Sequence, residues 1–406
     1  MNILIISHMY PSKTKEINGV FVHEQVKELI KQGHNVKVVS PVPFVPSLLK
    51  QLSPKWKNYD ATPATDVIDT VEVHYPTFIA LPKRINFHRS GQRMYHGIKK
   101  TVADIYKEFK FDVIHAHVAL PDGAAAVQLA QDFNVPLITT IHGQDLQHTI
   151  HKDLKCRNQV TQVLTESSNT ILVSHKLNTI RKKFFPEIED GKCTVIHNGV
   201  APLFLEPTKQ PVSTTNQTDI KILCVANLLQ PKGIDFSIKA MAKIVENYPN
   251  MTYQIIGVGP EADTLYRLVK KLGLENNVVF LGAKSREEVS RYMNESDIFL
   301  LPSWNEAFGV VYIEAMASGI PVIGCKGEGV EDIVDSGVDG YLVDPKDVDD
   351  IVRVTTELVA NPTMRLEMGK AARIKVENNF TWEKSAAKLI DVYTKYVSDQ
   401  RGEDIR

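Results

Sequence analysis

The chain has 406 residues, more than one hydrophobic core usually serves, which predicts two or three domains. Hydrophobic residues make up 43% and charged residues 23%, as in globular proteins and unlike disordered or fibrous chains. No apolar stretch approaches the ~18 residues needed to cross a bilayer, and the first residues lack the basic segment of a signal peptide, so we expect a cytoplasmic protein. The four cysteines are far apart, which argues against a disulfide framework or a zinc knuckle.

Charge is distributed unevenly along the chain. The formal net charge is −1, but residues 1–205 hold 24 Lys and Arg against 18 Asp and Glu, whereas residues 206–406 hold 23 against 30. Residues 73–103 contain no acidic residue and interleave apolar side chains with basic ones, namely Lys83, Arg84, Arg89, Arg93, Lys99 and Lys100. This composition suits an anionic surface or acceptor. The alternative is a solvated loop and helix face whose neighbours in space supply the acidic groups.

The first 40 residues follow the pattern of a βαβ unit. A strand is predicted at 3–7, a helix from about Val20 and a second strand at 36–39, with Gly33 where a helix C-terminal cap is expected. Further short apolar runs are separated by enough chain for helices, as a parallel sheet requires. These runs are 113–114, 137–138, 171–173 and 195–196. We therefore expect residues 1–205 to form one doubly wound domain.

A second α/β domain is predicted after a polar segment. Residues 206–219 are rich in Pro, Ser and Thr and have no periodic apolar pattern, which is typical of a linker. The strand and helix rhythm then restarts, with strands at 222–225, 253–256, 278–281 and 298–301 and helices at 234–247, 261–272 and 285–293. We expect a Rossmann-like domain over 206–380. Ligands of open parallel sheets bind beyond the carboxyl ends of the strands, so two such domains imply a cleft between them.

The segment 302–323 carries the strongest chemical pattern. A strand ends, a loop brings Glu306, and a helix begins near Gly309. A glycine at a helix start lets a ligand approach the backbone, and the N–H groups and helix dipole there favour a phosphate. Glu314 lies about one turn further along, where a carboxylate can accept hydrogen bonds from a ribose diol. Two ordinary surface glutamates are the alternative, but their placement around a strand-to-helix turn favours a site.

Residues 306–322 resemble the donor-site motif of the family 4 retaining glycosyltransferases of GT-B fold. Other family landmarks follow in order along nearly the whole chain: Gly33-His34, His142-Gly143-Gln144-Asp145, His197-Asn198-Gly199-Val200, Gln230-Pro231-Lys232-Gly233, Gly257-Val258-Gly259-Pro260-Glu261 and Phe380-Thr381-Trp382. The resemblance implies two Rossmann-like domains that face each other across a cleft. Within the family, residues 115–145 resemble bacterial members that build cell-surface polysaccharides on lipid carriers, teichuronic acid assembly included.

The resemblance implies roles for individual side chains in binding a nucleotide-diphosphate sugar. Lys232 would pair with the diphosphate, a role that suits a compact ammonium, and Glu314 would hold the ribose hydroxyls. Glu306 would contact the sugar hydroxyls near the reacting carbon. His142, from the first domain, would contact the donor sugar. Glu306 and His142 are thus the expected catalytic residues.

Backbone positions complete the implied donor site. Phe308, Gly309 and Val310 would bind the phosphate or the sugar, and Gly19 would let the loop after the first strand approach the phosphates. Asn227 departs from the family pattern, because members commonly have an arginine five residues before the lysine, and an amide brings no charge. Either the lysine and the helix N-terminus suffice, or a basic residue from elsewhere substitutes.

Two histidine pairs and one acidic pair imitate metal sites. Side chains alternate between the two faces of a strand, and no Cys or Asp cluster completes either histidine pair, so we expect no metal there. The acidic pair precedes an apolar helical pattern and suits a helix N-terminus better than an ion. The pairs are His115 with His117, His148 with His151, and Asp347 with Asp349.

The last stretch of the chain is predicted to be an amphipathic helix. Trp382, Leu389 and Tyr393 are among the apolar residues that recur there at near-helical intervals. By resemblance, residues 381–406 pack back on the first domain. The alternative is a terminal helix on the second domain.

Taken with these patterns, the resemblance implies a cytoplasmic retaining glycosyltransferase of hexosyltransferase type. The expected donor is a nucleotide-diphosphate sugar, with UDP as the nucleotide and without a metal or other cofactor. The expected acceptor is a glycan or lipid-linked molecule in cell-wall or other polysaccharide biosynthesis, with no nucleic-acid partner. The first domain is expected to contact the inner membrane face through residues 73–103 and 42–49. The alternatives are a GT-B sugar-nucleotide epimerase or phosphorylase, and a nucleotide-sugar binding protein without activity.

Overall fold

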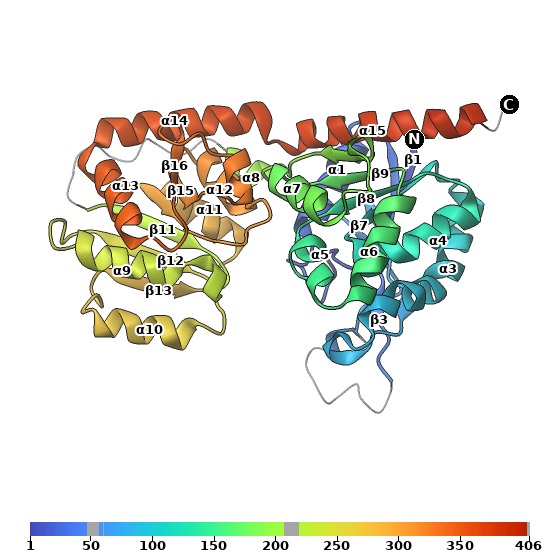
Figure 1. Ribbon diagram of the computed structural model, residues 1–406, viewed down its shortest axis with the longest axis horizontal. Helices are drawn as coiled ribbons and strands as arrows, with labels where there is room; N and C mark the ends of the chain where they lie inside the picture. The colour runs from blue at the N-terminus through green and yellow to red at the C-terminus, as the bar shows by residue number, and fades with distance from the viewer. Residues whose placement is uncertain (47–56, 60, 207–218, 404–406) are drawn as a thin grey trace. The chain divides into compact units, whose positions relative to one another are not determined.

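The computed structural model describes residues 1–46, 57–59, 61–206 and 219–403, which form two compact units (Figure 1). Unit 1 comprises Met1–Asn198 and the C-terminal segment from Trp382, and unit 2 comprises Gly199–Thr381. The chain leaves unit 1 once, a few residues before the predicted boundary at 205, and returns to it once. Almost all of the predicted linker, residues 206–219, lies outside the described residues.

Unit 1 is built, in the part of the chain that is described, on an eight-stranded sheet. The strand order is β10-β9-β8-β7-β1-β2-β5-β4, and neighbours are parallel except β4 and β5. The central strands are buried along their whole length, as expected of parallel strands covered on both faces. The predicted βαβ opening and parallel sheet are confirmed. The strands are β1 (Asn2–Ile6), β2 (Asn35–Val39), β4 (Thr65–Ile68), β5 (Val71–His74), β7 (Val113–His117), β8 (Leu137–Ile141), β9 (Asn169–Leu172) and β10 (Cys193–Val195).

Helices α1 (Val20–Lys31) and α15 (Trp382–Glu403) pack side by side in unit 1 (Figure 1). Leu389 and Tyr393 of α15 are fully buried and share one apolar cluster with Ile3 and Ile5 of β1. The end of the chain thus contributes to the core formed by its beginning. The other main helices of unit 1 are α3 (Ser90–Glu108), α4 (Ala124–Phe133), α5 (Gln144–Gln147), α6 (Leu154–Glu166) and α7 (His175–Phe184).

Unit 2 contains a parallel sheet of order β13-β12-β11-β14-β15-β16. The predicted strands and helices of this half are confirmed, although the predicted helix 234–247 ends at Ile244. The strands are β11 (Lys221–Val225), β12 (Thr252–Ile256), β13 (Val278–Gly282), β14 (Ile298–Leu300), β15 (Val322–Cys325) and β16 (Gly340–Val343). The helices are α8 (Pro202–Leu205), α9 (Ile234–Ile244), α10 (Ala262–Lys271), α11 (Arg286–Asn294), α12 (Val310–Ala317), α13 (Val348–Ala360) and α14 (Pro362–Asn379). None of the helices in the described ranges combines the length and hydropathy that crossing a membrane requires.

Candidate active site

The loop from β14 to α12 ends in a glycine that the geometry requires. Gly309 precedes the first residue of α12 and has φ of +97°, in the left-handed region that side chains disfavour. A Cβ at this position would lie 2.5 Å from the ring of Tyr312. The glycine therefore sets where α12 begins, and with it the direction in which Phe308, Gly309 and Val310 offer their backbone groups.

Lys232 and Glu306 form an ion pair in front of α12. Lys232 Nζ lies 2.6 Å from Glu306 Oε2, and the Ser303 hydroxyl donates to the same oxygen at 3.1 Å. Both charged side chains are largely buried, with 24% and 17% of their surface exposed. The pair thus brings the predicted diphosphate-binding cation and the predicted sugar-binding carboxylate together.

Backbone contacts explain how two residues far apart in sequence meet. Gly233 has φ of +68°, and a Cβ there would lie 2.3 Å from the Pro302 carbonyl oxygen. The Trp304 N–H donates to the Pro231 carbonyl at 2.9 Å. The turn that carries Lys232 therefore packs directly on the loop that carries Glu306.

Glu328 fixes the loop of Glu306, and the sequence analysis missed it. Its carboxylate accepts a 2.6 Å hydrogen bond from the Glu306 backbone N–H. A Cβ at Gly329 would lie 2.2 Å from the Ala307 carbonyl oxygen, so the segment after β15 packs closely on the same loop. The pattern Gly327-Glu328-Gly329 directly after a buried strand is the signal that could have identified this contact.

Glu314 lies on α12, one turn beyond its start, and its side chain is 15% exposed. Burial raises the pKa of its carboxyl to about 7, and the nearest cation, the Arg286 guanidinium at 3.9 Å, offsets only part of the shift. The group is therefore poised between its neutral and charged forms near neutral pH. A carboxyl in this state can exchange hydrogen bonds with a diol at little desolvation cost.

Asn227 lies two residues after the end of β11, and its side chain is exposed. The nearby Gly257 and Gly259 are explained by close packing. A Cβ at either would fall within 2.5 Å of the backbone oxygen of Ala226 or Leu228. These glycines let the loop after β12 approach the loop after β11, and their spacing is accounted for without a nucleotide.

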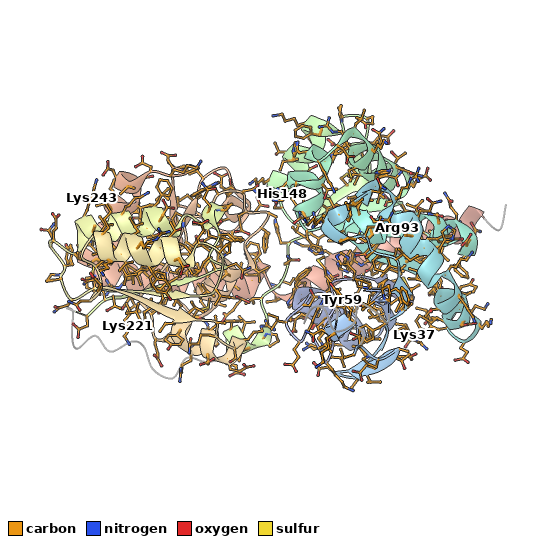
Figure 2. All side chains as sticks on the ribbon, turned by 90° about the horizontal axis from the view of Figure 1, so that it is seen from below. Lys37, Tyr59, Arg93, His148, Lys221 and Lys243 are labelled. Carbon is orange, nitrogen blue, oxygen red and sulfur yellow. The ribbon has the colours of Figure 1, made fainter. Side chains whose placement is uncertain are left out.

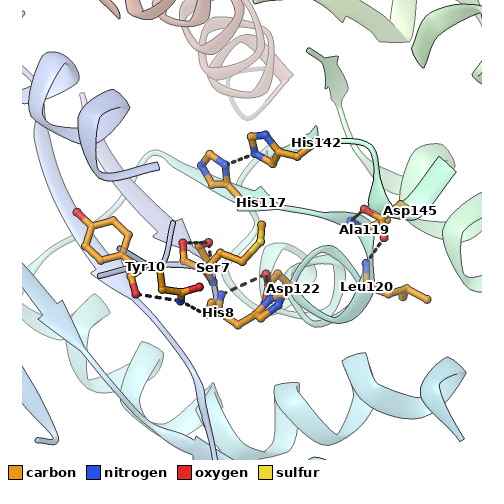
Figure 3. A network of polar contacts seen from close by, with 11 residues as sticks. Ser7, His8, Tyr10, His117, Ala119, Leu120, Asp122, His142 and Asp145 are labelled. Atoms are coloured by element: carbon orange, nitrogen blue, oxygen red, sulfur yellow. Dashed lines mark hydrogen bonds and ion pairs between the residues drawn. The ribbon is translucent and has the colours of Figure 1, made fainter. Parts of the chain in front are cut away.

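His142 lies just after β8 and contacts two aromatic rings of unit 1. Its Nε2 is 2.9 Å from Nδ1 of His117 (Figure 3). The centre of its ring lies 4.6 Å from that of Phe21. Burial lowers the pKa of His142 to about 3 and also lowers that of His117 well below its usual value. The two imidazoles are therefore neutral, and one of the two facing nitrogens donates a hydrogen bond to the other.

The expectation that His115 and His117 point apart was wrong. Residues two apart on a strand share a face, and the two rings lie 4.4 Å from each other. His115 is held by hydrogen bonds to the hydroxyls of Thr140 and Tyr393. Among the described residues these histidines thus serve a buried polar network.

The other imitations of metal sites have structural partners. Asp347 caps α13, since its carboxylate accepts from the N–H groups of Asp349 and Asp350, which confirms the predicted capping role. His151 packs against the ring of Phe184 at 5.1 Å, and His148 lies between α5 and the short turn that follows it.

Gly19 precedes the first residue of α1 and has φ of +66°. A Cβ there would lie 2.1 Å from the Met9 carbonyl oxygen. Close packing against the loop after β1 is therefore enough to require a glycine at this position. This contact sets the position of the loop that was predicted to approach the phosphates.

The two halves of the chain match two family models. Residues 19–202 match the model described as Glycosyltransferase Family 4, and residues 206–375 match the model described as Glycosyl transferases group 1. These matches together span most of the chain. The chain belongs to the family 4 glycosyltransferases of GT-B fold, which confirms the predicted family, fold class and enzyme class.

Particular relatives align over most of the chain. A Bacillus subtilis protein named, provisionally, as a teichuronic acid biosynthesis glycosyltransferase is 25% identical over 97% of this chain and 98% of its own length. The N-acetyl-alpha-D-glucosaminyl L-malate synthase of Bacillus anthracis is 26% identical over 81% of this chain and 91% of its own length.

Solved structures show the same fold. A sucrose-phosphate synthase from Thermosynechococcus elongatus superposes with a TM-score of 0.77 at 20% identity, covering 98% of this chain and all of the other. The Anabaena protein HepE in complex with UDP superposes with a TM-score of 0.73 at 19% identity, covering 97% of this chain and all of the other. At these identities the likeness establishes the architecture.

Proposed function

We propose that the chain is a retaining hexosyltransferase that moves a sugar from a nucleotide-diphosphate donor to a glycan or lipid-linked acceptor in cell-surface polysaccharide synthesis. The proposal rests on one arrangement: the Lys232–Glu306 pair stands before α12, with buried Glu314 one turn along that helix. The arrangement offers a cation and a helix N-terminus to a diphosphate, and a buried carboxyl to a ribose.

The proposed reaction proceeds without a protein nucleophile. The bond from the anomeric carbon to the leaving phosphate oxygen breaks, the acceptor oxygen bonds to the same face of that carbon, and the leaving phosphate takes the acceptor proton. Lys232 and the start of α12 stabilise the charge that grows on the diphosphate, and Glu306 orients the sugar and stabilises positive charge at the anomeric carbon. The ammonium has three donors, so it can bind Glu306 and the diphosphate together.

We further propose that the enzyme works without a metal or other cofactor. Lys232 and the helix N-terminus supply the positive potential that a divalent cation would otherwise bring to a diphosphate. The Asp347–Asp349 pair resembles a metal-binding motif, but the Asp347 carboxylate accepts a hydrogen bond from the Asp349 N–H at the start of α13.

Two similarities support the proposed substrates. HepE has been crystallised with UDP and with UDP-glucose, which supports UDP as the nucleotide. The name of the Bacillus subtilis relative refers to teichuronic acid biosynthesis, which supports an acceptor in cell-surface polysaccharide synthesis.

We also propose that the enzyme is cytoplasmic and that unit 1 contacts the inner membrane face. Ile79 and Ile85 are 60% and 53% exposed and lie within a few residues of the basic Lys83 and Arg84 in the sequence. Phe44, 55% exposed, belongs to the predicted apolar segment 42–49, of which residues 47–49 lie outside the described residues. Exposed apolar side chains next to basic ones suit a surface that carries anionic lipid.

The experiment is a donor panel of UDP-, GDP- and ADP-sugars, assayed for hydrolysis and for transfer to acceptors, with and without EDTA. We expect turnover of UDP-sugars, unchanged by EDTA, and NMR of the product should show the anomeric configuration of the donor. An inverted product would overturn retention, and rescue of an EDTA-treated enzyme by Mg²⁺ would overturn metal independence. Epimerisation of the donor in the absence of an acceptor would favour an epimerase. Binding of the donor without any turnover would favour a nucleotide-sugar binding protein without activity.

A further inference from the structure

A cavity of about 310 Å³ lies in unit 1, beyond the carboxyl ends of β1, β7 and β8. Residues from the loops that follow these strands and from the start of α3 line it. Its walls are mostly apolar, with Phe78, Leu81, Phe87 and Leu120 among them. A cavity at this edge of a parallel sheet is where such sheets bind ligands. No residue of the donor site described in unit 2 lines it.

The basic side chains of the cavity favour an anion. His8, Arg84 and Arg93 line it, and no carboxylate among the described residues forms an ion pair with either arginine. The one acidic residue of the lining, Asp145, is fully buried and accepts hydrogen bonds from two backbone N–H groups of the loop after β7. The cavity therefore presents positive charge on an apolar background.

Ser90 marks the place where the anion would bind. It also lines the cavity and is the first residue of α3, a helix of 19 residues whose first turn carries no acidic residue. Its side chain is 4% exposed, and its hydroxyl has no hydrogen-bond partner among the described residues. A buried hydroxyl without a partner is costly, so a ligand that accepts its hydrogen bond would remove the penalty. The positive end of the α3 dipole favours an anionic ligand.

Asp122 orients the His8 ring and favours its protonated form. His8 Nδ1 lies 2.7 Å from Asp122 Oδ2, which also accepts the His8 backbone N–H (Figure 3). Asp122 is fully buried, whereas the His8 side chain is 38% exposed, and the contact with Asp122 engages Nδ1 and not Nε2. Burial alone would lower the pKa of His8, but the charge and hydrogen bond of Asp122, with a contribution from Asp145, raise it despite the opposing charge of Arg84.

The segment beside Arg84 is held in a strained conformation. Lys83, Arg84 and Asn86 all have φ between 48° and 55°, which non-glycine residues rarely adopt. The Arg93 guanidinium, on α3 (Figure 2), donates to the carbonyls of Ile79 and Asn86 and so holds both ends of the segment. Strain that the surroundings maintain in this way is concentrated where a side chain must be presented to a ligand.

We propose that this cavity is the acceptor subsite for an anionic amphiphile, with a phosphate or similar anion bound by Ser90, His8 and Arg84 and the attached hydrocarbon lying on the apolar walls. The inference deepens the proposed function, because it assigns the acceptor class that the transferase would use. It makes no use of the donor site, so the two can be tested separately.

The experiment measures ligand binding to the full chain with octyl phosphate, inorganic phosphate and octanol, all below micellar concentrations. We expect octyl phosphate to bind at least about ten-fold more tightly than either of the other two, because it satisfies both the charge and the apolar walls. If inorganic phosphate binds as tightly, the site is for free phosphate and the proposal fails. If octanol binds as tightly, the site is merely apolar and the proposal fails.

Two variants and a control locate the binding. Ser90→Ala should weaken octyl phosphate binding by about ten-fold while leaving the melting temperature unchanged or higher, since it removes a hydroxyl that has no hydrogen-bond partner among the described residues. His8→Gln should weaken binding by a similar factor. Lys107→Gln, which removes a charge from the far end of the same helix, outside the cavity and outside residues 73–103, should bind as the wild type does.

Unchanged binding in both Ser90→Ala and His8→Gln would overturn the proposal. UDP binding, measured on the same samples, separates the two inferences. If UDP binds and octyl phosphate does not, the acceptor subsite is wrong and the transferase proposal stands. If octyl phosphate binds and UDP-sugars do not, the donor chemistry is wrong and the anion site stands.

Discussion

Three contacts hold Glu306, two at its carboxylate and one at its backbone. Lys232 and Ser303 bind its Oε2, and Glu328 holds its backbone N–H. A group held in this way loses little conformational freedom when substrate arrives, so more of its interaction energy is available to the transition state. A mutation of Glu306 is therefore expected to lower the rate of the chemical step more than it weakens donor binding.

Substituting the two glutamates should separate chemistry from recognition. Glu306→Gln keeps a hydrogen-bonding side chain but loses the charge, and we expect kcat to fall by about 10²-fold or more with donor affinity changed only a few-fold. Glu314→Ala should chiefly weaken donor binding, by about ten-fold. Steady-state kinetics with a donor titration measure both effects.

Glu275→Gln, an exposed change in unit 2, serves as the control and should leave both constants unchanged. The contrary result would be a glycosyl adduct on the peptide that contains Glu306, seen by mass spectrometry after incubation with donor alone. Such an adduct would make Glu306 a covalent nucleophile.

The raised pKa of Glu314 predicts a pH dependence of stability. Its carboxyl titrates near 7 in the folded chain and near 4.5 in the unfolded chain, so between these values the folded state binds more protons. Stability therefore falls as pH rises through this window, by up to about 3 kcal/mol. Urea unfolding at pH 5 and pH 8 should show a smaller fall for Glu314→Gln than for the wild type. Equal falls in both proteins would contradict the assignment.

At the residue scale the sequence predicted the positions that local pattern determines. Glu306, Gly309 and Glu314 could be placed because a strand, a loop and a helix are visible around them. The ion pair between Lys232 and Glu306 and the hydrogen bond from the Glu306 N–H to Glu328 depend on which loops pack together. Residue spacing in the sequence does not directly show which loops these are. Strand geometry already places His115 and His117 on the same face, and the prediction applied that rule wrongly.

Elements with strong periodicity were predicted well, and short or irregular ones were not. The strands and helices of unit 2 through β14 appear close to where the apolar pattern put them. The hairpin β4–β5 was missed, because its sequence, with half-exposed strands and a tight turn at Asp69 and Thr70, lacks the continuous apolar run used to find the others. Helix α14, with little segregation of apolar residues to one side, was missed for a similar reason.

Helix α15 should be important for the stability of unit 1. Leu389 is fully buried in the cluster that includes Ile3 and Ile5, so Leu389→Ala should destabilise the protein by about 2–5 kcal/mol. Denaturant unfolding measures this change. The neighbouring exposed Lys388→Ala should have an effect within about 0.5 kcal/mol. A small effect of Leu389→Ala would mean that α15 contributes little to the core.

At the scale of the whole molecule, the proposed membrane contact predicts salt-sensitive binding to vesicles. The protein should float with anionic vesicles at low salt and much less at about 1 M salt, where charges are screened within about 3 Å. Replacing exposed Ile79 and Ile85 together by Ser should weaken binding to anionic vesicles. Val279→Ser, which changes an exposed apolar residue of unit 2, is the matched control. Equal recovery with neutral and anionic vesicles would contradict the contact.

The chain enters and leaves unit 2 at neighbouring points. The Val200 N–H donates to the Phe380 carbonyl at 2.7 Å, and Val200 pairs with Thr381 as a parallel bridge. Unit 2 is thus an insertion whose two ends meet, as in proteins that accept a guest domain within a surface loop. A short Gly-Ser loop could then replace residues 199–381 and rejoin β10 to α15, and the resulting protein, built on the eight-stranded sheet, should unfold cooperatively. If the proposed donor site in unit 2 is correct, replacing this unit alone should change the donor sugar and leave the core of unit 1 intact.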